Sequence, residues 1–391
     1  MRMRKRILVA YGTRPEAVKV APLINRLAES RHLEPVAVIT GQHQQMLDQV
    51  NAVFGITPAY NLEVFESGQS LNTLSAKVLR GIDQLLLDIE PHAVLVQGDT
   101  TTVAMSGIAA FNRQIPVVHL EAGLRSGNIR EPFPEEGNRR LVGQVAALHL
   151  APTAEARENL LRENFPARDV VVTGNTVIDA ILKASQLPRA FSDPRVAAVV
   201  ASGRRIILLT AHRRENLGAP MRAIADAVAE LARRFPAATI IFPAHKNPHV
   251  RQAFRPALES LSNVMLIEQL DYVEFIHLQQ ASYLVLTDSG GVQEEAPSLG
   301  KPVLVLRNNT ERPEAVTAGT VRLVGTDTDR IVEEASHLMS DTNAYRAMAQ
   351  VANPYGDGNA AERSVAAMEH LLGVGERLPD FVPAGADESA A

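Results

Sequence analysis

The sequence predicts an α/β protein made of two Rossmann-like domains. Short apolar runs rich in β-branched residues alternate with helix-length segments along the chain, which is typical of parallel strands joined by crossover helices. The series of strands restarts after a break at Gly174 and Asn175. Several runs end in glycine or polar residues, and ligands of open α/β sheets bind beyond the carboxyl ends of the strands. We therefore expect the functional residues at these ends.

The first domain is expected over residues 1–174 and the second over 175–358. A terminal helix is expected over about 359–374, after a turn-rich segment, because its apolar residues recur with helical spacing. Residues 375–391 are expected to form a flexible tail. The runs expected to be strands are 6–12, 34–40, 92–99, 115–121, 170–175, 205–212, 238–245, 263–268, 282–288 and 301–306.

The composition excludes several classes of protein. The chain has 391 residues, 46% of them hydrophobic, and contains no cysteine. The length suits two cores, while the missing thiols exclude disulfides, thiolate metal sites and cysteine nucleophiles. The sequence has no run of about 18 apolar residues and no signal-type start, so we expect a cytoplasmic protein without a membrane partner. A net charge of -5 with mixed signs argues against nucleic acid.

Basic residues open the first expected helix. Gly12, Thr13 and Arg14 follow the first strand, and Pro15 suits a first helical position because its missing N–H is not needed there. The free N–H groups of the helix, with Arg14 and Lys19, would suit a phosphate. A capped helix with an exposed arginine explains the same residues.

Acidic residues of the first domain indicate acid–base chemistry. Asp99 and Glu121 each close an expected strand, where a charge is costly unless it is paired or used. Glu135 and Glu136 open a helix after two prolines, and these carboxylates could join the other two. They could instead be partners of the helix dipole.

Two segments of the second domain favour anion binding. Ser289, Gly290 and Gly291 form a strand-to-helix turn that lets backbone approach an anion, and Glu295 on the following helix could hold ribose hydroxyls. The glycines could also merely make a tight turn. His212 closes another strand before two arginines, and it could contact a pyrophosphate and help it leave. The basic segment 243–249 is either a further anion contact or plain surface.

Two cofactor signatures are weak in this sequence. Residues 356–361 match the spacing of a dinucleotide-binding loop, but they follow a turn and no strand, which argues against NAD. No close metal-binding triad of His or Asp residues is present, so we expect no metal cofactor. The expected cofactor requirement is therefore none.

Eight segments, taken in order, resemble the non-hydrolysing UDP-N-acetylglucosamine 2-epimerases. The likeness extends from about Ile7 to the terminal helix. No single motif is decisive, but the ordered set is highly specific. The segments are GTRPEAVKVAPLI, TGQHQQML, QGDTTT, HLEAGLRS, PFPEEGNRR, TGNTVID, AHRREN and TDSGGVQEEAPSLGKPVLVLRNNTERPEAV.

The resemblance implies a fold and a reaction. The fold is the GT-B architecture, two Rossmann-like domains with the nucleotide sugar in the interdomain cleft, the last helix packed on the first domain, and a homodimer. The reaction interconverts UDP-GlcNAc and UDP-ManNAc through elimination and re-addition of UDP, with a 2-acetamidoglucal intermediate. The product would supply ManNAc for surface polysaccharide synthesis.

The resemblance also assigns residues. Asp99, Glu121 and Glu135 match the family's acid–base carboxylates, and His212 matches its essential histidine near the phosphates. The residues that match substrate-binding positions are Arg14, Lys19, Phe275, Ser289, Gly290, Gly291, Glu295 and Arg312. The residues that match positions around a second, activating UDP-GlcNAc are Gln42, Gln45, Arg213 and His245. A capped helix start explains the two glutamines equally well.

Three other functions use overlapping residues. A hydrolysing epimerase would follow the same elimination but let water intercept the intermediate. A GT-B glycosyltransferase would need an acceptor groove and no proton exchange at C2. A sugar-nucleotide sensor could dispense with the carboxylates, all of which are present here.

Overall fold

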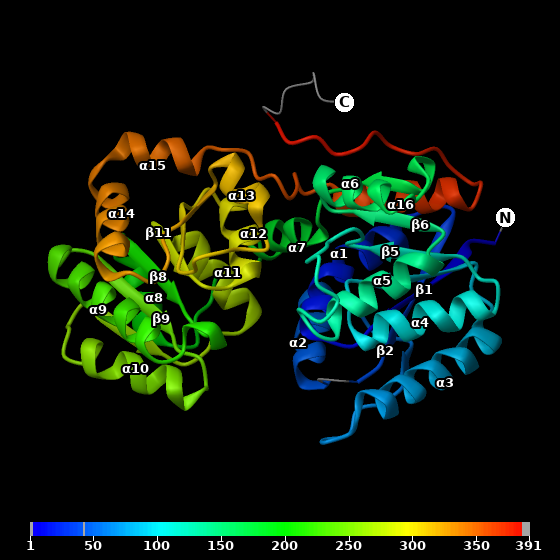
Figure 1. Cartoon of the computed structure of the whole chain (residues 1–391), viewed down its shortest axis with the longest axis horizontal. Helices are drawn as coiled ribbons and strands as arrows, with labels where there is room; N and C mark the ends of the chain where they lie inside the picture. Colours follow the sequence, from blue (N-terminus) through cyan, green and yellow to red (C-terminus); the bar gives the residue numbers. More distant parts are fainter. Residues whose placement is uncertain (1–2, 42–43, 385–391) are drawn as a thin grey trace. The chain divides into compact units, whose positions relative to one another are not determined.

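The computed structural model describes residues 3–41 and 44–384, without the side chains of 44–46. The chain divides into two compact units. Unit 1 holds the residues up to Ala180 and the chain from Tyr355 onward, and unit 2 holds Ile181–Pro354. The division falls inside a helix, later than the break at Gly174 that the sequence suggested. Figure 1 colours the chain along its sequence, so that unit 1 contains both the blue and the red segments.

Unit 1 is built on a parallel sheet of seven strands within the described residues, in the order β3-β2-β1-β4-β5-β6-β7. The inner strands are apolar and buried on both faces, as helices on either side of a parallel sheet require. The strands are β1 (Lys5–Tyr11), β2 (Leu33–Ile39), β3 (Tyr60–Asn61), β4 (Ala93–Gln97), β5 (Val117–Leu120), β6 (Leu148–Ala151) and β7 (Val170–Val172). The α-helices are α1 (Arg14–Glu29), α2 (Gln44–Phe54), α3 (Leu71–Ile89), α4 (Thr101–Asn112), α5 (Glu135–Val145), α6 (Ala154–Arg162), α7 (Thr176–Ala184) and α16 (Ala360–Leu371).

Unit 2 repeats this plan with a parallel sheet of six strands, also counted within the described residues, in the order β10-β9-β8-β11-β12-β13. Its core packs helices against the apolar side chains of these strands. The strands are β8 (Ile206–Thr210), β9 (Thr239–Pro243), β10 (Val264–Ile267), β11 (Leu284–Thr287), β12 (Val303–Val305) and β13 (Val321–Leu323). The α-helices are α8 (Pro194–Ala201), α9 (Ala219–Arg234), α10 (Pro248–Leu258), α11 (Tyr272–Ala281), α12 (Gly290–Ser298), α13 (Pro313–Ala318), α14 (Thr328–Ser340) and α15 (Thr342–Ala349).

The strand orders confirm the predicted fold class, two Rossmann-like domains of the GT-B architecture. In each unit the order runs outward from a central pair, so a switch point lies between β1 and β4 and another between β8 and β11. Three short strands lay outside the expected runs, namely β3, β6 and β13. They are two to four residues long and too short to show a periodic pattern.

The last helix, α16, belongs to unit 1 (Figure 1). The half-buried carboxylate of Asp179 on α7 accepts hydrogen bonds from the N–H groups of Ala360 and Ala361, at 3.3 and 2.8 Å. These two donors are among those that a helix start leaves without a partner. Arg26 on α1 adds an ion pair to Glu362, at 2.7 Å.

Part of the expected flexible tail packs on unit 1. Phe381 is 5% exposed, its N–H donates to the carbonyl of Val172 on β7, and the guanidinium of Arg363 lies 5.3 Å from the centre of its ring. Arg377 donates to the carbonyl of Val170 at 3.2 Å. Residues 377–381 therefore make contacts with unit 1, and the flexibility of the segment 375–391 stays a prediction. Because this segment is largely polar, the sequence did not reveal that Phe381 packs on unit 1.

Candidate functional site

Gly12 lies at the switch point of unit 1, between the end of β1 and the start of α1. A Cβ on Gly12 would lie 2.2 Å from Oγ1 of Thr40 and 2.8 Å from Oγ1 of Thr102, so only glycine fits there. Thr13 caps α1, and Glu16 completes a capping box. This close packing brings the loops after β1, β2 and β4 together.

Glu16 is buried beside these loops and has a structural part. Its carboxylate accepts from the N–H groups of Gly12 and Thr13, at 2.9 and 2.6 Å, and from the hydroxyl of Thr100, at 2.7 Å. Burial raises the pKa of Glu16, while these hydrogen bonds oppose the rise. Glu16 thus fixes the position of the residue that follows Asp99.

Glu121 ends β5 with its carboxylate surrounded by donors. Lys19 from α1 forms an ion pair with it, Gln97 from β4 donates to it, and Asn175 donates at 3.1 Å. The backbone of Glu121 has a φ of 64°, a left-handed conformation that is costly for a residue with a side chain. The side chain is 8% exposed. Such strain, held by several partners, is a common feature of functional sites.

Asp99 lies on the neighbouring strand end, after β4. Arg139 of α5 forms an ion pair with its carboxylate, and the side-chain amide of Asn138 donates to its carbonyl at 2.9 Å. The Asp99 side chain is 26% exposed, so it is open to a ligand on one side. Because β4 and β5 are paired, with Gln97 opposite Leu120, Asp99 and Glu121 follow neighbouring strands, and Glu121 lies level with Gly98, the residue before Asp99.

The two glutamates at the start of α5 behave differently. Glu136 is fully buried and binds the N–H of Ser126, at 3.1 Å, and the side chains of Arg139 and Arg140. Arg139 joins Glu136 to Asp99, but the carboxylate of Glu136 is fully buried and is not open to a ligand. The side chain of Glu135 makes no hydrogen bond or ion pair within the described part of the chain. It lies one turn before Arg139, which holds Asp99.

The structure brings most of the predicted residues of unit 1 to one edge of the sheet. The contacts above join Lys19 to Glu121 and join Asp99 to α5, and the two groups follow the neighbouring strands β5 and β4. Lys19 was predicted as a phosphate contact, but here it is an ion-pair partner of Glu121. Arg14, the second residue after Gly12, is half-buried and has no ion pair among residues 3–41 and 44–384.

Two buried histidines support this edge from within the sheet. His119 of β5 and His149 of β6 lie opposite each other, and each is 1% exposed. His119 Nε2 lies 2.8 Å from the carbonyl of Gly98, next to Asp99. Burial lowers the pKa of His119 to about 4. Burial, together with the positive charges of His119 and Arg125, lowers the pKa of His149 to about 3.

The switch point of unit 2 gathers His212 and the loop after β11. The carboxylate of Asp288 is fully buried, and it accepts from the N–H groups of His212 and Arg213. The His212 ring has its Nδ1 3.3 Å from Asp288 and stacks on His245 at a centroid distance of 5.6 Å. Burial lowers the pKa of His212, Asp288 opposes the change, and His245 and Arg213 add to it.

The start of α12 has features that suit an anion. Ser289 precedes the helix without a side-chain cap, so the first N–H groups stay available. A Cβ on Gly290 would lie 3.4 Å from the guanidinium of Arg213 and 3.8 Å from that of Arg312. Arg312 is oriented by an ion pair with Glu294, which is buried. Two guanidinium groups therefore flank the helix start.

Two further predicted residues lie close to this helix start. A Cβ on Gly291 would lie 3.5 Å from the carboxylate of Glu295, which accepts from the side chain of Gln279 at 3.1 Å. Phe275 lies on α11 one turn before Gln279 and is half-buried. The structure thus places an acid near the glycines, and it places Phe275 on the helix that carries the hydrogen-bond partner of that acid.

The four predicted activator contacts are only partly described. Gln42 lies outside the described residues, and the side chain of Gln45 does as well. Arg213 and His245 lie beside His212 in unit 2, where His245 Nδ1 accepts from the N–H of Asn247 at 3.1 Å. Arg213 is thus next to the α12 start. Whether the four residues bind one ligand stays a prediction.

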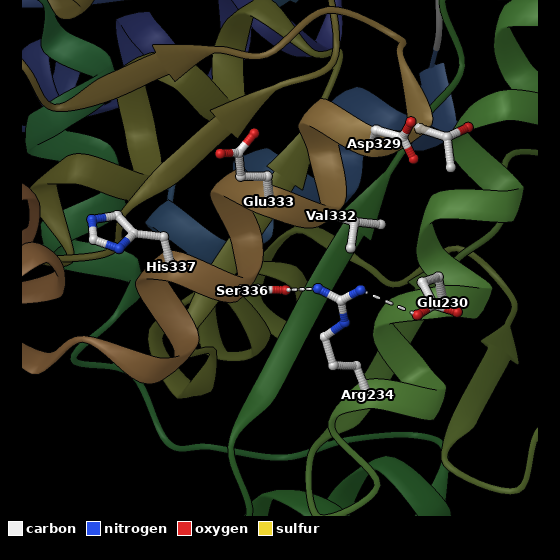
Figure 2. A pocket seen from close by; sticks show the side chains of 8 residues that line it. Glu230, Arg234, Asp329, Val332, Glu333, Ser336 and His337 are labelled. Atoms are coloured by element: carbon white, nitrogen blue, oxygen red, sulfur yellow. Dashed lines mark hydrogen bonds and ion pairs between the residues drawn. The ribbon is translucent and has the colours of Figure 1, made fainter.

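A separate cavity of about 660 Å³ lies between α9 and α14 (Figure 2). Arg234 crosses it, donating to Glu230 and to Ser336, both at 3.3 Å. None of the predicted site residues lines it. Within the described residues, no group of three or more His, Asp or Glu side chains could hold a metal ion.

Sequence reasoning missed several residues of the site. Gln97, Asn175 and Arg139 hold the two carboxylates, and Asp288 organises the His212 loop. All four stand inside motifs that were recognised, but a motif does not show which side chains its residues contact. The available signal for Asp288 was its place at the end of a buried strand, where a charge needs partners.

Comparison with known proteins gives a consistent family. A family model described as UDP-N-acetylglucosamine 2-epimerase matches residues 25–369. A relative from Salmonella typhimurium with that name is 46% identical, with 93% of this chain and 98% of the relative covered. One from Bacillus subtilis with the same name is 45% identical, with 96% and 98% covered.

A solved structure from the same family is similar to this chain. The Neisseria meningitidis UDP-GlcNAc 2-epimerase, bound to UDP-GlcNAc, superimposes with a TM-score of 0.84 at 44% identity and covers 94% of this chain and all of its own. Among the residues that the structure describes, no helix has the length and apolar character needed to cross a membrane.

Proposed function

The chain belongs to the UDP-N-acetylglucosamine 2-epimerase family, and we propose that it converts UDP-GlcNAc reversibly into UDP-ManNAc without releasing the free sugar. The observation that carries the proposal is the set of carboxylates at one edge of the unit 1 sheet. Asp99 and Glu121 follow the neighbouring strands β4 and β5, and Arg139 links Asp99 to the helix that begins at Glu135. Inversion at a carbon needs proton transfer on two faces, so it needs more than one such group.

The chemistry explains why an anion site must accompany the carboxylates. The proton on C2 is not next to a carbonyl and is too weakly acidic for simple removal. When a base takes it, the electrons of the C2–H bond form the C1–C2 double bond, while those of the C1–O bond leave with UDP. Protonation of the resulting 2-acetamidoglucal on the opposite face, with re-addition of UDP at C1, completes the inversion. The departing diphosphate needs fixed positive charge.

Unit 1 would handle the protons. Glu121 is held by Lys19, Gln97 and Asn175, and Asp99 by Arg139, so both carboxylates are fixed in place before substrate arrives. Glu135 has no bonding partner within the described residues and would be available to the substrate. We propose that these three carboxylates share the two proton transfers.

Unit 2 would hold UDP. The uncapped start of α12 and the guanidinium groups near Gly290 would bind the diphosphate. Glu295 would accept hydrogen bonds from the ribose, and Phe275 would contact the base. His212 would stabilise the negative charge of the departing diphosphate.

Three further features belong to the proposal. The enzyme would work as a homodimer, and a second UDP-GlcNAc would activate it through Gln42, Gln45, Arg213 and His245. It would need no metal or nucleotide cofactor, because the leaving group is stabilised by arginines and a helix start. UDP-ManNAc would supply a surface polysaccharide pathway.

Proton NMR of the protein with UDP-GlcNAc in D₂O tests the proposal. We expect UDP-ManNAc carrying deuterium at C2, because the proton taken by a carboxylate exchanges with solvent. Release of free ManNAc and UDP would instead identify the hydrolysing reaction. An unchanged spectrum despite binding of UDP-GlcNAc would reject epimerisation and favour a glycosyltransferase or a sensor.

A further inference from the structure

Asp288 is a buried carboxylate to which neither the motifs nor the proposed reaction assigns a part. It follows β11, its side chain is 0% exposed, and a charge in such a place is costly unless donors surround it. The N–H of His212 lies 2.9 Å from Oδ2 and that of Arg213 also 2.9 Å from Oδ2. The side chain of Asn216 donates to Oδ2 at 3.2 Å. The loop after β8 is thus wrapped around this carboxylate.

One contact of Asp288 is made to the imidazole ring of His212 and does not hold the loop after β8. Nδ1 of His212 lies 3.3 Å from Oδ1 of Asp288. An ionised carboxylate can only accept, so this contact favours the neutral imidazole that carries its proton on Nδ1. Nε2 is then the nitrogen left for a ligand. A carboxylate that orients a histidine in this way sets its tautomer and supports the positive charge that forms when Nε2 takes a proton.

The other charged groups around the ring act against protonation. Arg213 adjoins His212 in the chain, and the ring of His245 stacks on it at 5.6 Å with an angle of 19° between the planes. Burial and these two neighbours lower the pKa of His212, and Asp288 is the acidic group that opposes them. The His212 side chain is still 40% exposed, so it can meet a ligand.

We propose that Asp288 is a positioning residue that holds His212 in the Nδ1–H tautomer and supports a positive charge on its ring when a diphosphate departs. The proposed tautomer rests on the contact between Nδ1 of His212 and Oδ1 of Asp288, within unit 2. The effect on turnover rests on the proposed function. The alternative is that Asp288 only shapes the loop.

Asn216 provides the matched control. Its side chain donates to Asp288 at 3.2 Å and to the carbonyl of Leu306 at 3.1 Å, so it fastens the loop but does not touch the imidazole. Asp288→Asn keeps the size of the side chain and removes the charge. Asn216→Ala removes side-chain hydrogen bonds that hold the loop and keeps the charge of Asp288. If Asp288 were only a loop anchor, the two variants would behave alike.

Nitrogen NMR of the full chain with ¹⁵N-labelled histidine, in the absence of substrate, tests the proposal. His212→Gln identifies the signals of His212 among the 11 histidines. We expect the Nδ1–H tautomer in the wild-type protein. We expect Asp288→Asn to lower the pKa of His212 and to populate the Nε2–H tautomer, and Asn216→Ala to change neither. An Nε2–H tautomer in the wild-type protein would overturn the proposal without any variant.

Turnover gives the second measurement. Asp288→Asn should lower kcat by about 10–100-fold, with a smaller change in KM, as is common for residues that orient an active histidine. The pH profile of kcat should shift with the pKa of His212. Equal losses in the two variants, or an unchanged pH profile in Asp288→Asn, would reduce Asp288 to a loop anchor. If the chain has no epimerase activity, the proposed function is wrong, but the tautomer of His212 measured without substrate is unaffected.

Discussion

Acidification should destabilise unit 1 through its two buried histidines. His119 and His149 are each 1% exposed, and burial lowers their pKa values to about 4 and about 3. Their pKa values in the unfolded chain are about 6.5. At a pH between the folded and unfolded pKa values, the two histidines are protonated in the unfolded chain but not in the folded chain. The free energy of unfolding therefore falls as the pH falls below about 6.5. The stabilisation is fully present above that pH.

The size of the effect follows from these pKa values. At about pH 5, linkage gives a loss of about 2 kcal/mol for each histidine relative to about pH 7.5. The two sites interact, so about 4 kcal/mol is an upper value for the pair. His119→Gln removes one titrating group and keeps a donor for the carbonyl of Gly98. It should lower the loss by about half.

Amide hydrogen exchange, followed by mass spectrometry, can measure the pH-dependent loss of stability in each of the two units separately. After correction for the intrinsic effect of pH, peptides covering 117–120 and 148–151 should lose protection by about 30-fold for each 2 kcal/mol. A peptide covering 206–210 in unit 2 serves as the internal control. Equal changes in both units would refute the reasoning, and so would a pH dependence in His119→Gln as large as that of the wild-type protein.

Further predictions concern the site and the chain end. Glu121→Gln should lower turnover by at least about 100-fold with UDP affinity retained in calorimetry, because a proton-transfer group is lost; wild-type turnover would remove Glu121 from the reaction. Arg312→Met should weaken UDP binding by about tenfold or more, and an unchanged affinity would place the diphosphate elsewhere. Phe381→Ala should lower the free energy of unfolding of unit 1 by about 3 kcal/mol in urea titrations, whereas no change would contradict its packing on β7. Activity should survive EDTA and the omission of NAD, and dependence on either would contradict cofactor-free catalysis.

Much of the fold could be predicted from the sequence because its signals are local. Apolar runs such as 92–99 and 282–288 are long enough to indicate buried strands, and glycine or polar residues after them mark the ends where ligands bind. The terminal segment shows the limit. Residues 375–391 are polar enough to suggest a tail, yet Phe381 packs on β7. A contact between residues so far apart in the chain leaves no periodic pattern to read.

For the site, the sequence by itself determined which residue types stand at the strand ends, among them Asp99, Glu121 and His212. Only the tertiary structure decided what each of them touches. It paired Lys19 with Glu121, gave Glu136 a structural place beside the arginines of α5, and put Asp288 against the His212 ring. The physical reason is that a side chain's partners come from the strand order. Neighbours such as β8 and β11 are joined by pairing across the sheet and are far apart along the chain.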